Sequence, residues 1–130
     1  MLVKEIMTPK EKLILASPMA TVREALKLMR VHGVRSIVVE KSSSSGAYGL
    51  VTYKNILQSI VAQDGDIDLL NLYDIAASPT ISVSALLNVK YAARMMVTNS
   101  IKRLLVIDNN ELYGMLTMSD IISVLMDSIE

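Results

Sequence analysis

A nine-residue pattern that occurs twice, at residues 49–57 and 114–122, limits the folds open to this chain. In each copy a glycine opens a short apolar run that ends in threonine. An Asp or Asn follows three positions after the threonine, just before another apolar segment. We interpret each copy as a strand that runs into the N-terminus of a helix. Two such junctions indicate a duplicated half-domain.

The repetition extends over the rest of the chain. The matching segments are 3–7 with 72–76, 21–29 with 88–96, and 34–39 with 101–106. The offset is 67 between Val34 and Ile101 but 65 between Gly49 and Gly114, because the second hairpin is two residues shorter. Length changes that are confined to loops indicate a true internal duplication. We therefore predict two repeats, residues 1–65 and 66–130.

Each repeat is predicted to have the element order β-α-β-β-α. In the first, we expect a short strand at 12–16 and a helix between the capping box at Thr21 and Gly33. Strands at 34–39 and 48–52 and a helix at 55–62 follow. Neither repeat alone could bury both faces of its sheet. The fold class is therefore α/β (α+β), with the two repeats packed with pseudo-twofold symmetry through their small sheets.

The duplicated junction has two possible roles. Free backbone N–H groups and the helix dipole make such a junction suitable for an anion that carries a polar group. The same spacing is also a capping box, in which Thr117 and Asp120 would hydrogen-bond each other's backbone. The spacing alone is compatible with both roles.

Composition excludes several classes of function. Thirteen basic and thirteen acidic residues cancel, so no nucleic acid and no membrane surface is expected as a partner. The absence of cysteine excludes disulfides and thiolate metal sites and agrees with a cytoplasmic location. No apolar run approaches the ~18 residues of a membrane span, and no signal peptide is recognisable.

An enzyme is not expected. The single histidine, His32, lies beside Gly33 in a predicted loop, and no Ser/His/Asp set or zinc-type cluster is available. The acidic run that begins at Asp64 resembles the start of a calcium loop, but Ile75 occupies the position of its bidentate Glu. We therefore predict no catalytic residues, no metal and no catalytic cofactor.

Together these segments resemble a tandem pair of cystathionine-β-synthase (CBS) domains, called a Bateman module. The resemblance covers nearly all of the chain and rests on residues 6–9, 21–29, 33–36 and 101–104 and on the two junctions. Members of this family typically bind adenosine-containing ligands in two clefts between the repeats. The resemblance implies AMP, ADP, ATP or S-adenosylmethionine as the ligand.

In the main site, the resemblance implies that Asp120 accepts hydrogen bonds from the ribose hydroxyls and that Thr117 donates to phosphate. Arg35 and Lys102 would supply positive charge to the phosphate. Alternatively, these two are strand-end residues that extend into solvent or pair with Glu40 or Asp108. The other residues expected to line this site are Ser119, Met115, Ala20 and Val34.

The second site is expected to be weaker, because Asn55 stands where the family prefers Asp. An amide can accept from a ribose hydroxyl but carries no charge, which costs on the order of 1 kcal/mol. The other residues expected there are Thr52, Lys54, Leu50, Leu87 and Ile101, and Lys54 could add a phosphate contact.

Two functions follow from these expectations. The first is a regulatory module that senses an adenine nucleotide and passes the signal through repacking of a homodimer or of a regulated protein partner. The alternative is a structural homodimerisation module with degenerate, empty clefts, which Asn55 and the neutral net charge would fit.

Overall fold

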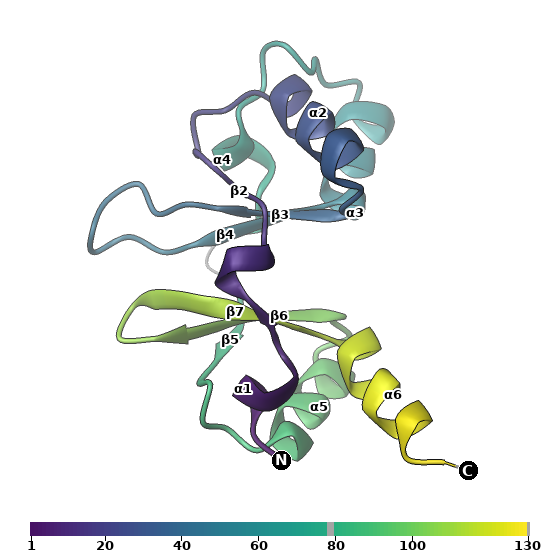
Figure 1. Cartoon of the computed structure of the whole chain (residues 1–130). Helices are drawn as coiled ribbons and strands as arrows, with labels where there is room; N and C mark the ends of the chain where they lie inside the picture. Colours follow the sequence, from purple (N-terminus) through teal and green to yellow (C-terminus); the bar gives the residue numbers. More distant parts are fainter. Residues whose placement is uncertain (78–79, 130) are drawn as a thin grey trace. The chain divides into compact units, whose positions relative to one another are not determined.

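The computed structural model describes residues 1–77 and 80–129, which form two compact units (Figure 1). The central unit is Ile14–Thr80, and the terminal unit combines Met1–Leu13 with Ile81–Glu130. The first thirteen residues therefore pack with the second repeat, although they precede the first repeat in sequence. The predicted boundary between residues 65 and 66 separates the two sequence repeats. The compact units divide the chain at other positions, so this boundary stays a prediction.

The central unit contains a three-stranded sheet of order β2-β3-β4, with β2 parallel to β3 and β3 antiparallel to β4. The strands are β2 (Leu15–Ala16), β3 (Ser36–Val39) and β4 (Gly49–Thr52). The helical elements are α2 (Val22–His32), α3 (Tyr53–Ile56), the π-helix η2 (Leu57–Ala62) and α4 (Leu72–Ile75). The helices α2, α3 and α4 lie on one face of this sheet (Figure 1).

The core of the central unit lies between this sheet face and the helices. Val22, Ala25 and Met29 recur at helical spacing along α2, and all three are buried against Ile37 of β3 and Val51 of β4. Burial of a whole aliphatic side chain contributes about 1.5–3 kcal/mol. The packing of α2 therefore fixes the position of the loop that precedes it.

Helix α2 begins and ends where the sequence predicts. The Thr21 hydroxyl accepts from the Glu24 N–H (3.2 Å), and the Glu24 carboxylate accepts from the Thr21 N–H (3.3 Å). Gly33 ends the helix in the left-handed region, with φ +63°. The capping box and the C-terminal glycine are both confirmed, whereas His32, expected in a loop, is the last residue of the helix.

Replacing Gly33 by alanine is expected to lower the free energy of unfolding by about 1 kcal/mol, because an L side chain is strained at this φ. An added Cβ would meet no atom within 4 Å, so the cost is conformational alone. Urea unfolding of Gly33→Ala and of Gly33→Asn measures this cost. Asparagine tolerates the left-handed region, so its variant should lose less; equal losses would show that another contact is responsible.

The terminal unit contains a four-stranded sheet of order β1-β7-β6-β5. The strands are β1 (Thr8–Pro9), β5 (Ser82–Val83), β6 (Arg103–Asp108) and β7 (Glu111–Thr117). The helices are α1 (Val3–Ile6), the 3₁₀-helix η1 (Lys10–Lys12), α5 (Val89–Thr98) and α6 (Met118–Asp127). Strand β1 pairs antiparallel with β7, so a segment about a hundred positions earlier in the sequence joins this sheet.

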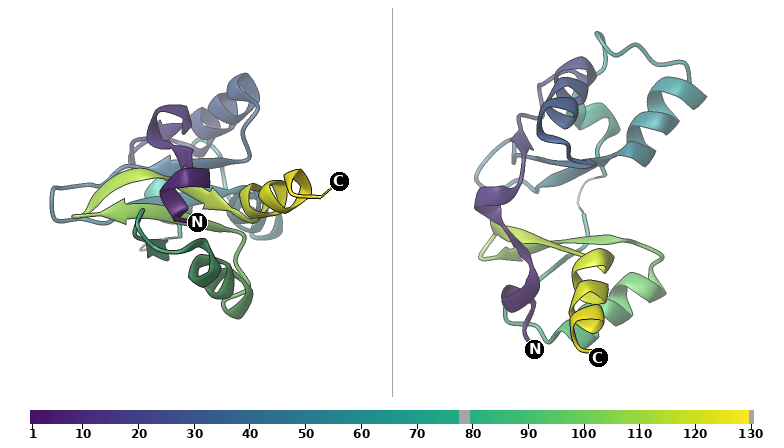
Figure 2. Two further views of the ribbon diagram at one scale, coloured as in Figure 1. Left: turned by 60° about the horizontal axis from the view of Figure 1, so that its bottom comes forward. Right: turned by 45° about the vertical axis from the view of Figure 1, so that its right-hand side comes forward.

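Helices α1, α5 and α6 lie on one face of this second sheet, and α5 and α6 lie side by side (Figures 1 and 2). Val3 of α1 and Met96 of α5 are buried against Leu104 and Leu116 of the sheet. The core is built from small aliphatic and methionine side chains, which fill irregular gaps without aromatic anchors. This packing fixes the end of β7, where α6 begins.

The two hairpins differ as the sequence predicts. Asn109 and Asn110 join β6 to β7 with φ of 52° and 60°, which is a two-residue turn of type I′. Asparagine suits this turn because it adopts positive φ more readily than other side chains. The serine-rich loop of the first repeat is longer, and the tighter turn expected in the second repeat is confirmed.

Three expected elements are only partly present. The strand predicted at 34–39 begins at Ser36. The strand predicted at 12–16 is shorter, because η1 ends at Lys12 and β2 starts at Leu15. The helix predicted at 55–62 changes to a π-helix at Leu57. Its last turn is closed by Gly65, whose N–H donates to the Ser59 carbonyl (3.0 Å), and a Cβ at Gly65 would lie 2.5 Å from that oxygen.

Candidate ligand-binding site

The second junction, where β7 runs into α6, forms a complete capping box. The Thr117 N–H donates to Oδ2 of Asp120 (2.9 Å), and the Asp120 N–H donates to the Thr117 hydroxyl oxygen (3.1 Å). The capping role is therefore confirmed. Each side chain can still form further hydrogen bonds. A carboxylate has two acceptor oxygens, and the Thr117 hydroxyl still has its own hydrogen to donate. Both residues are half-buried, so part of each stays accessible.

Lys102 is held next to this junction by its backbone. Its carbonyl accepts from the N–H of Met118, the first residue of α6 (3.0 Å), and Arg103 lies opposite Thr117 in the β6–β7 ladder. The Lys102 side chain is exposed. The terminal unit thus brings an acid, a hydroxyl and a lysine backbone together at one helix start.

The alternative in which the strand cations pair with nearby acids is not found among the residues that the structure describes. Asp108 instead accepts from the Ala85 N–H (3.0 Å). Arg35 is exposed just before β3, as Lys102 is just before β6. Both cations therefore extend into solvent, which leaves them available to an anionic ligand.

Two of the residues expected to line the sites offer little surface. Met115 lies within β7 and is 4% exposed, and Leu50 lies within β4 and is 8% exposed. Ser119, in the first turn of α6, is exposed. Met115 and Leu50 would thus form walls, whereas Ser119 can present its hydroxyl.

The first junction is hydrogen-bonded differently from the second. Oδ1 of Asn55 accepts from both the N–H (2.8 Å) and the hydroxyl (3.0 Å) of Thr52. The hydroxyl hydrogen of Thr52 is therefore already donated, whereas that of Thr117 is not given to Asp120. Lys54 is exposed in the first turn of α3. In this arrangement Thr52 can donate to a phosphate only if it breaks its bond to Asn55.

The remaining candidates lie on loops and strand starts of their own units. Ala20 and Val34 pack against the core of the central unit, and Leu87 and Ile101 pack against the core of the terminal unit. All four are half-buried. Their participation in the sites with Asp120 and Asn55 stays a prediction.

The acidic run after Gln63 has a structural role in the central unit. Asp66 accepts from the Asp68 N–H (2.8 Å), and Asp68 pairs with Arg23. Within the described ranges, no group of three or more His, Cys, Asp or Glu side chains could hold a metal ion. No helix in the described part of the chain is long and apolar enough to cross a bilayer.

A comparison with protein families decides the identity of this architecture. The model of the CBS domain matches residues 3–62 and again residues 72–127. The chain belongs to the CBS domain family. It is a tandem CBS pair, and its two matches correspond to the duplication that the sequence reveals.

Among similar proteins, the uncharacterized protein MK0525 of Methanopyrus kandleri is 32% identical over 116 residues. These cover 88% of this chain but 59% of that protein, so the chain spans about three fifths of that relative. The hexameric CBS-CP12 protein from bloom-forming cyanobacteria has a TM-score of 0.86 and is 31% identical. That match covers 100% of this chain and 75% of the other.

Two more distant CBS pairs share the fold at a TM-score of 0.84. CBSX2 was solved in complex with AMP; it is 20% identical, over 99% of both chains. The CBS domain pair of protein MJ0100 was solved with 5′-methylthioadenosine and S-adenosyl-L-methionine; it is 21% identical, over 99% of this chain and 98% of the other.

Proposed function

We propose that this CBS pair is a cytoplasmic regulatory module that binds an adenosine-type ligand, such as AMP, ADP, ATP or S-adenosylmethionine. Binding changes the packing of a homodimer or of a regulated protein partner. The observation that carries the proposal is the second junction, where the Asp120 carboxylate completes the capping box of α6 and keeps an acceptor oxygen beyond the one that binds the Thr117 N–H. The adenosine compounds held by CBSX2 and by the MJ0100 pair support this class of ligand.

Each group at the main site has a distinct task in this proposal. The Asp120 carboxylate accepts from the ribose hydroxyls, at about 1.5–3 kcal/mol for each charge-assisted bond. The Thr117 hydroxyl donates to the phosphate, whose charge Lys102 and Arg35 balance. The rest of the site is lined by Ser119, Met115, Ala20 and Val34.

The weaker site is formed around Asn55. Its amide oxygen already accepts two bonds from Thr52, so a ribose hydroxyl competes with the protein's own donors. Lys54 adds positive charge for phosphate. The remaining lining is Leu50, Leu87 and Ile101. The two sites therefore differ in affinity.

Calorimetric titration of the full chain with AMP, ADP, ATP and S-adenosylmethionine tests the proposal. We expect at least one of these to bind in two unequal steps. Asn55→Asp should strengthen the weaker step several-fold, because about 1 kcal/mol is gained when a neutral acceptor becomes charged. A wild type that binds none of the four more tightly than about 1 mM would contradict the proposal.

A second candidate function is a structural homodimerisation module with empty sites. It is favoured by apolar side chains that α6 leaves uncovered in this single chain: Leu125 is 58% exposed and Met126 is 64% exposed. Exposed apolar patches of this kind mark interaction surfaces. Sedimentation velocity separates the cases, since a chain that stays monomeric at micromolar concentration would contradict a dimerisation role.

A further inference from the structure

In the central unit, the segment that leads into α4 is hydrogen-bonded to the loop before α2. The Leu72 N–H donates to the Ala20 carbonyl (2.8 Å), and the Tyr73 N–H donates to the Pro18 carbonyl (3.0 Å). In return, the Leu70 carbonyl accepts from the Val22 N–H (3.0 Å). Ala20, a predicted lining residue of the main site, is thus held by residues about fifty positions later.

The terminal unit repeats this three-bond pattern with its own residues. The Val3 N–H donates to the Leu87 carbonyl (2.8 Å), the Lys4 N–H to the Ala85 carbonyl (2.9 Å), and the Val89 N–H to the Met1 carbonyl (2.9 Å). Leu87 is the counterpart of Ala20 in the duplication and a predicted lining residue of the weaker site. Residues 70–73 in the central unit and residues 1–4 in the terminal unit therefore each fix a predicted lining residue through the same set of backbone hydrogen bonds.

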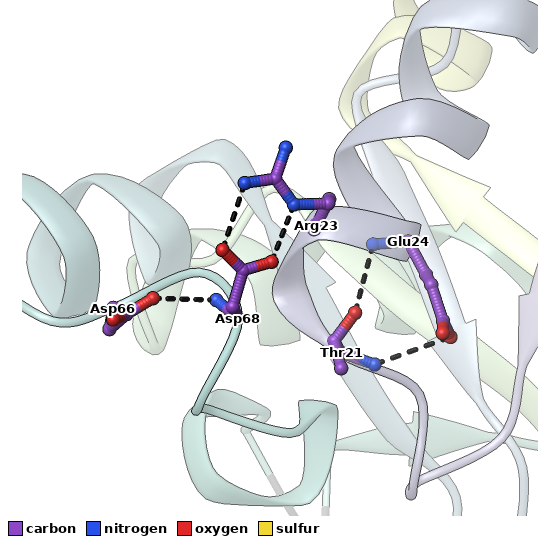
Figure 3. A network of polar contacts seen from close by, with 5 residues as sticks. All are labelled: Thr21, Arg23, Glu24, Asp66 and Asp68. Atoms are coloured by element: carbon purple, nitrogen blue, oxygen red, sulfur yellow. Dashed lines mark hydrogen bonds and ion pairs between the residues drawn. The ribbon is translucent and has the colours of Figure 1, made fainter.

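The central unit adds a side-chain clasp to this pattern (Figure 3). Arg23 binds Asp68 through two nitrogens: Nε donates to Oδ1, and Nη2 donates to Oδ2 (2.9 Å). The Arg23 N–H also donates to the Ile67 carbonyl (3.0 Å), and Asp66 closes the same turn by accepting from the Asp68 N–H. A bidentate Arg–carboxylate pair fixes orientation as well as distance.

The terminal unit places Lys90 at the position that corresponds to Arg23. The Nζ atom of Lys90 lies 4.9 Å from the centre of the Tyr91 ring, and the Lys90 N–H donates to the Asn88 side chain (2.9 Å). No ion pair of the Arg23–Asp68 kind is found around Lys90 among the described residues. Among the described residues, the clasp therefore occurs in the central unit and not around Lys90. It gives the loop that contains Ala20 a support that the loop containing Leu87 lacks.

Backbone and capping hydrogen bonds next to the clasp complete the N-terminus of α2. The first three N–H groups of this helix are all satisfied: Val22 donates to Leu70, Arg23 to Ile67, and Glu24 to Thr21.

The hydrogen bonds from Arg23 lower the pKa of the Asp68 carboxyl, which stays ionised at neutral pH. Since the two side chains are 49% and 57% exposed, the pair contributes little to global stability. Its effect is local order of the turn.

We infer that Arg23 and Asp68 are positioning residues for the ligand site that includes Ala20. This inference rests on the proposed function. The ion pair holds residues 66–70 against the start of α2, and the Leu72 N–H then holds the Ala20 carbonyl. Loss of the pair leaves the three backbone bonds and the fold intact but loosens residues 66–70, so a ligand must restore the order of this turn, and of the Ala20 carbonyl that it supports, when it binds.

Asp68→Ala is expected to weaken the tighter AMP step by about threefold, which is the size of effect typical of an exposed ion pair. The weaker step should not change. The difference between wild type and variant should shrink in 1 M KCl, because salt screens an exposed pair. Lys90→Ala, which removes the corresponding cation of the other unit, is the matched control and should leave the tighter step unchanged.

Two further measurements separate positioning from a general loss of structure. The exchange rate of the Leu72 amide should rise in Asp68→Ala, while that of the buried Leu104 stays at the wild-type value. The exchanged pair Arg23→Asp with Asp68→Arg should restore both the Leu72 protection and the affinity. Wild-type affinity for both steps in Asp68→Ala would overturn the positioning role alone. A wild type that binds no adenosine compound would overturn the proposed function as well.

Discussion

Gly114→Ala is expected to lower the free energy of unfolding by about 3 kcal/mol, near the upper end of the cost of overpacking. Pro9 of β1 lies opposite Gly114 in the β1–β7 pair. A Cβ at Gly114 would lie 2.3 Å from the Thr8 carbonyl oxygen and 3.0 Å from the sulfur of Met7. The first of these atoms is backbone, so β1 must move away and loses its pairing with β7.

Gly49→Ala is the matched control, because Gly49 opens the same motif in the first repeat. A Cβ there would meet the Ala76 Cβ at 3.2 Å and the Ala77 carbonyl oxygen at 3.4 Å, which requires shifts of only a few tenths of an ångström. Its cost should be clearly smaller. Urea denaturation of both variants measures the difference. Equal losses of unfolding free energy in the two variants would mean that the close approach of β1 to Gly114 is not what makes its substitution costly.

Asp120→Ala is expected to weaken the tighter nucleotide step at least about a hundredfold, because it removes two proposed charge-assisted bonds to the ribose hydroxyls, each of about 1.5–3 kcal/mol. It also removes the half of the α6 capping box in which the Asp120 carboxylate accepts from the Thr117 N–H, which costs about 1 kcal/mol of stability. Asp120→Asn separates the two effects. Asparagine can still accept from the Thr117 N–H, as Asn55 does from Thr52, so the cap is kept and only the charge is lost.

For Asp120→Asn we expect a loss of affinity of about fivefold to tenfold with little change in the midpoint of thermal unfolding. Affinity should therefore increase from the alanine variant to the asparagine variant and from that to wild type. Calorimetry measures the affinity and differential scanning calorimetry the stability. An alanine variant with wild-type affinity would remove Asp120 from the site.

The parts of the fold that the sequence predicts correctly are those determined by local chemistry. The Thr21 capping box, the left-handed Gly33 and the Asn109–Asn110 turn each depend on residues a few positions apart. The duplication supports these local predictions further, because two copies of one sequence pattern are expected to adopt the same structure. The Thr117–Asp120 capping box, one of the two roles that the spacing allows, is also local in this sense.

The parts that the sequence does not predict depend on distant or geometric relations. The pairing of Pro9 with Gly114 and the contact of Arg23 with Asp68, 45 positions apart, have no local signal. The π-helix from Leu57 has the same apolar pattern as an α-helix. The Thr52 hydroxyl donates to the Asn55 amide oxygen, whereas the Thr117 hydroxyl accepts from the Asp120 N–H, and the shared spacing does not encode this difference.

A crystal structure of the full chain grown with AMP would show directly whether Asp120 holds the ribose. We predict that both ribose hydroxyls lie within hydrogen-bond distance of the Asp120 carboxylate, with the phosphate near Thr117 and Lys102. AMP bound away from α6, or an Asp120 carboxylate that contacts only the Thr117 N–H while AMP is present elsewhere on the chain, would contradict it.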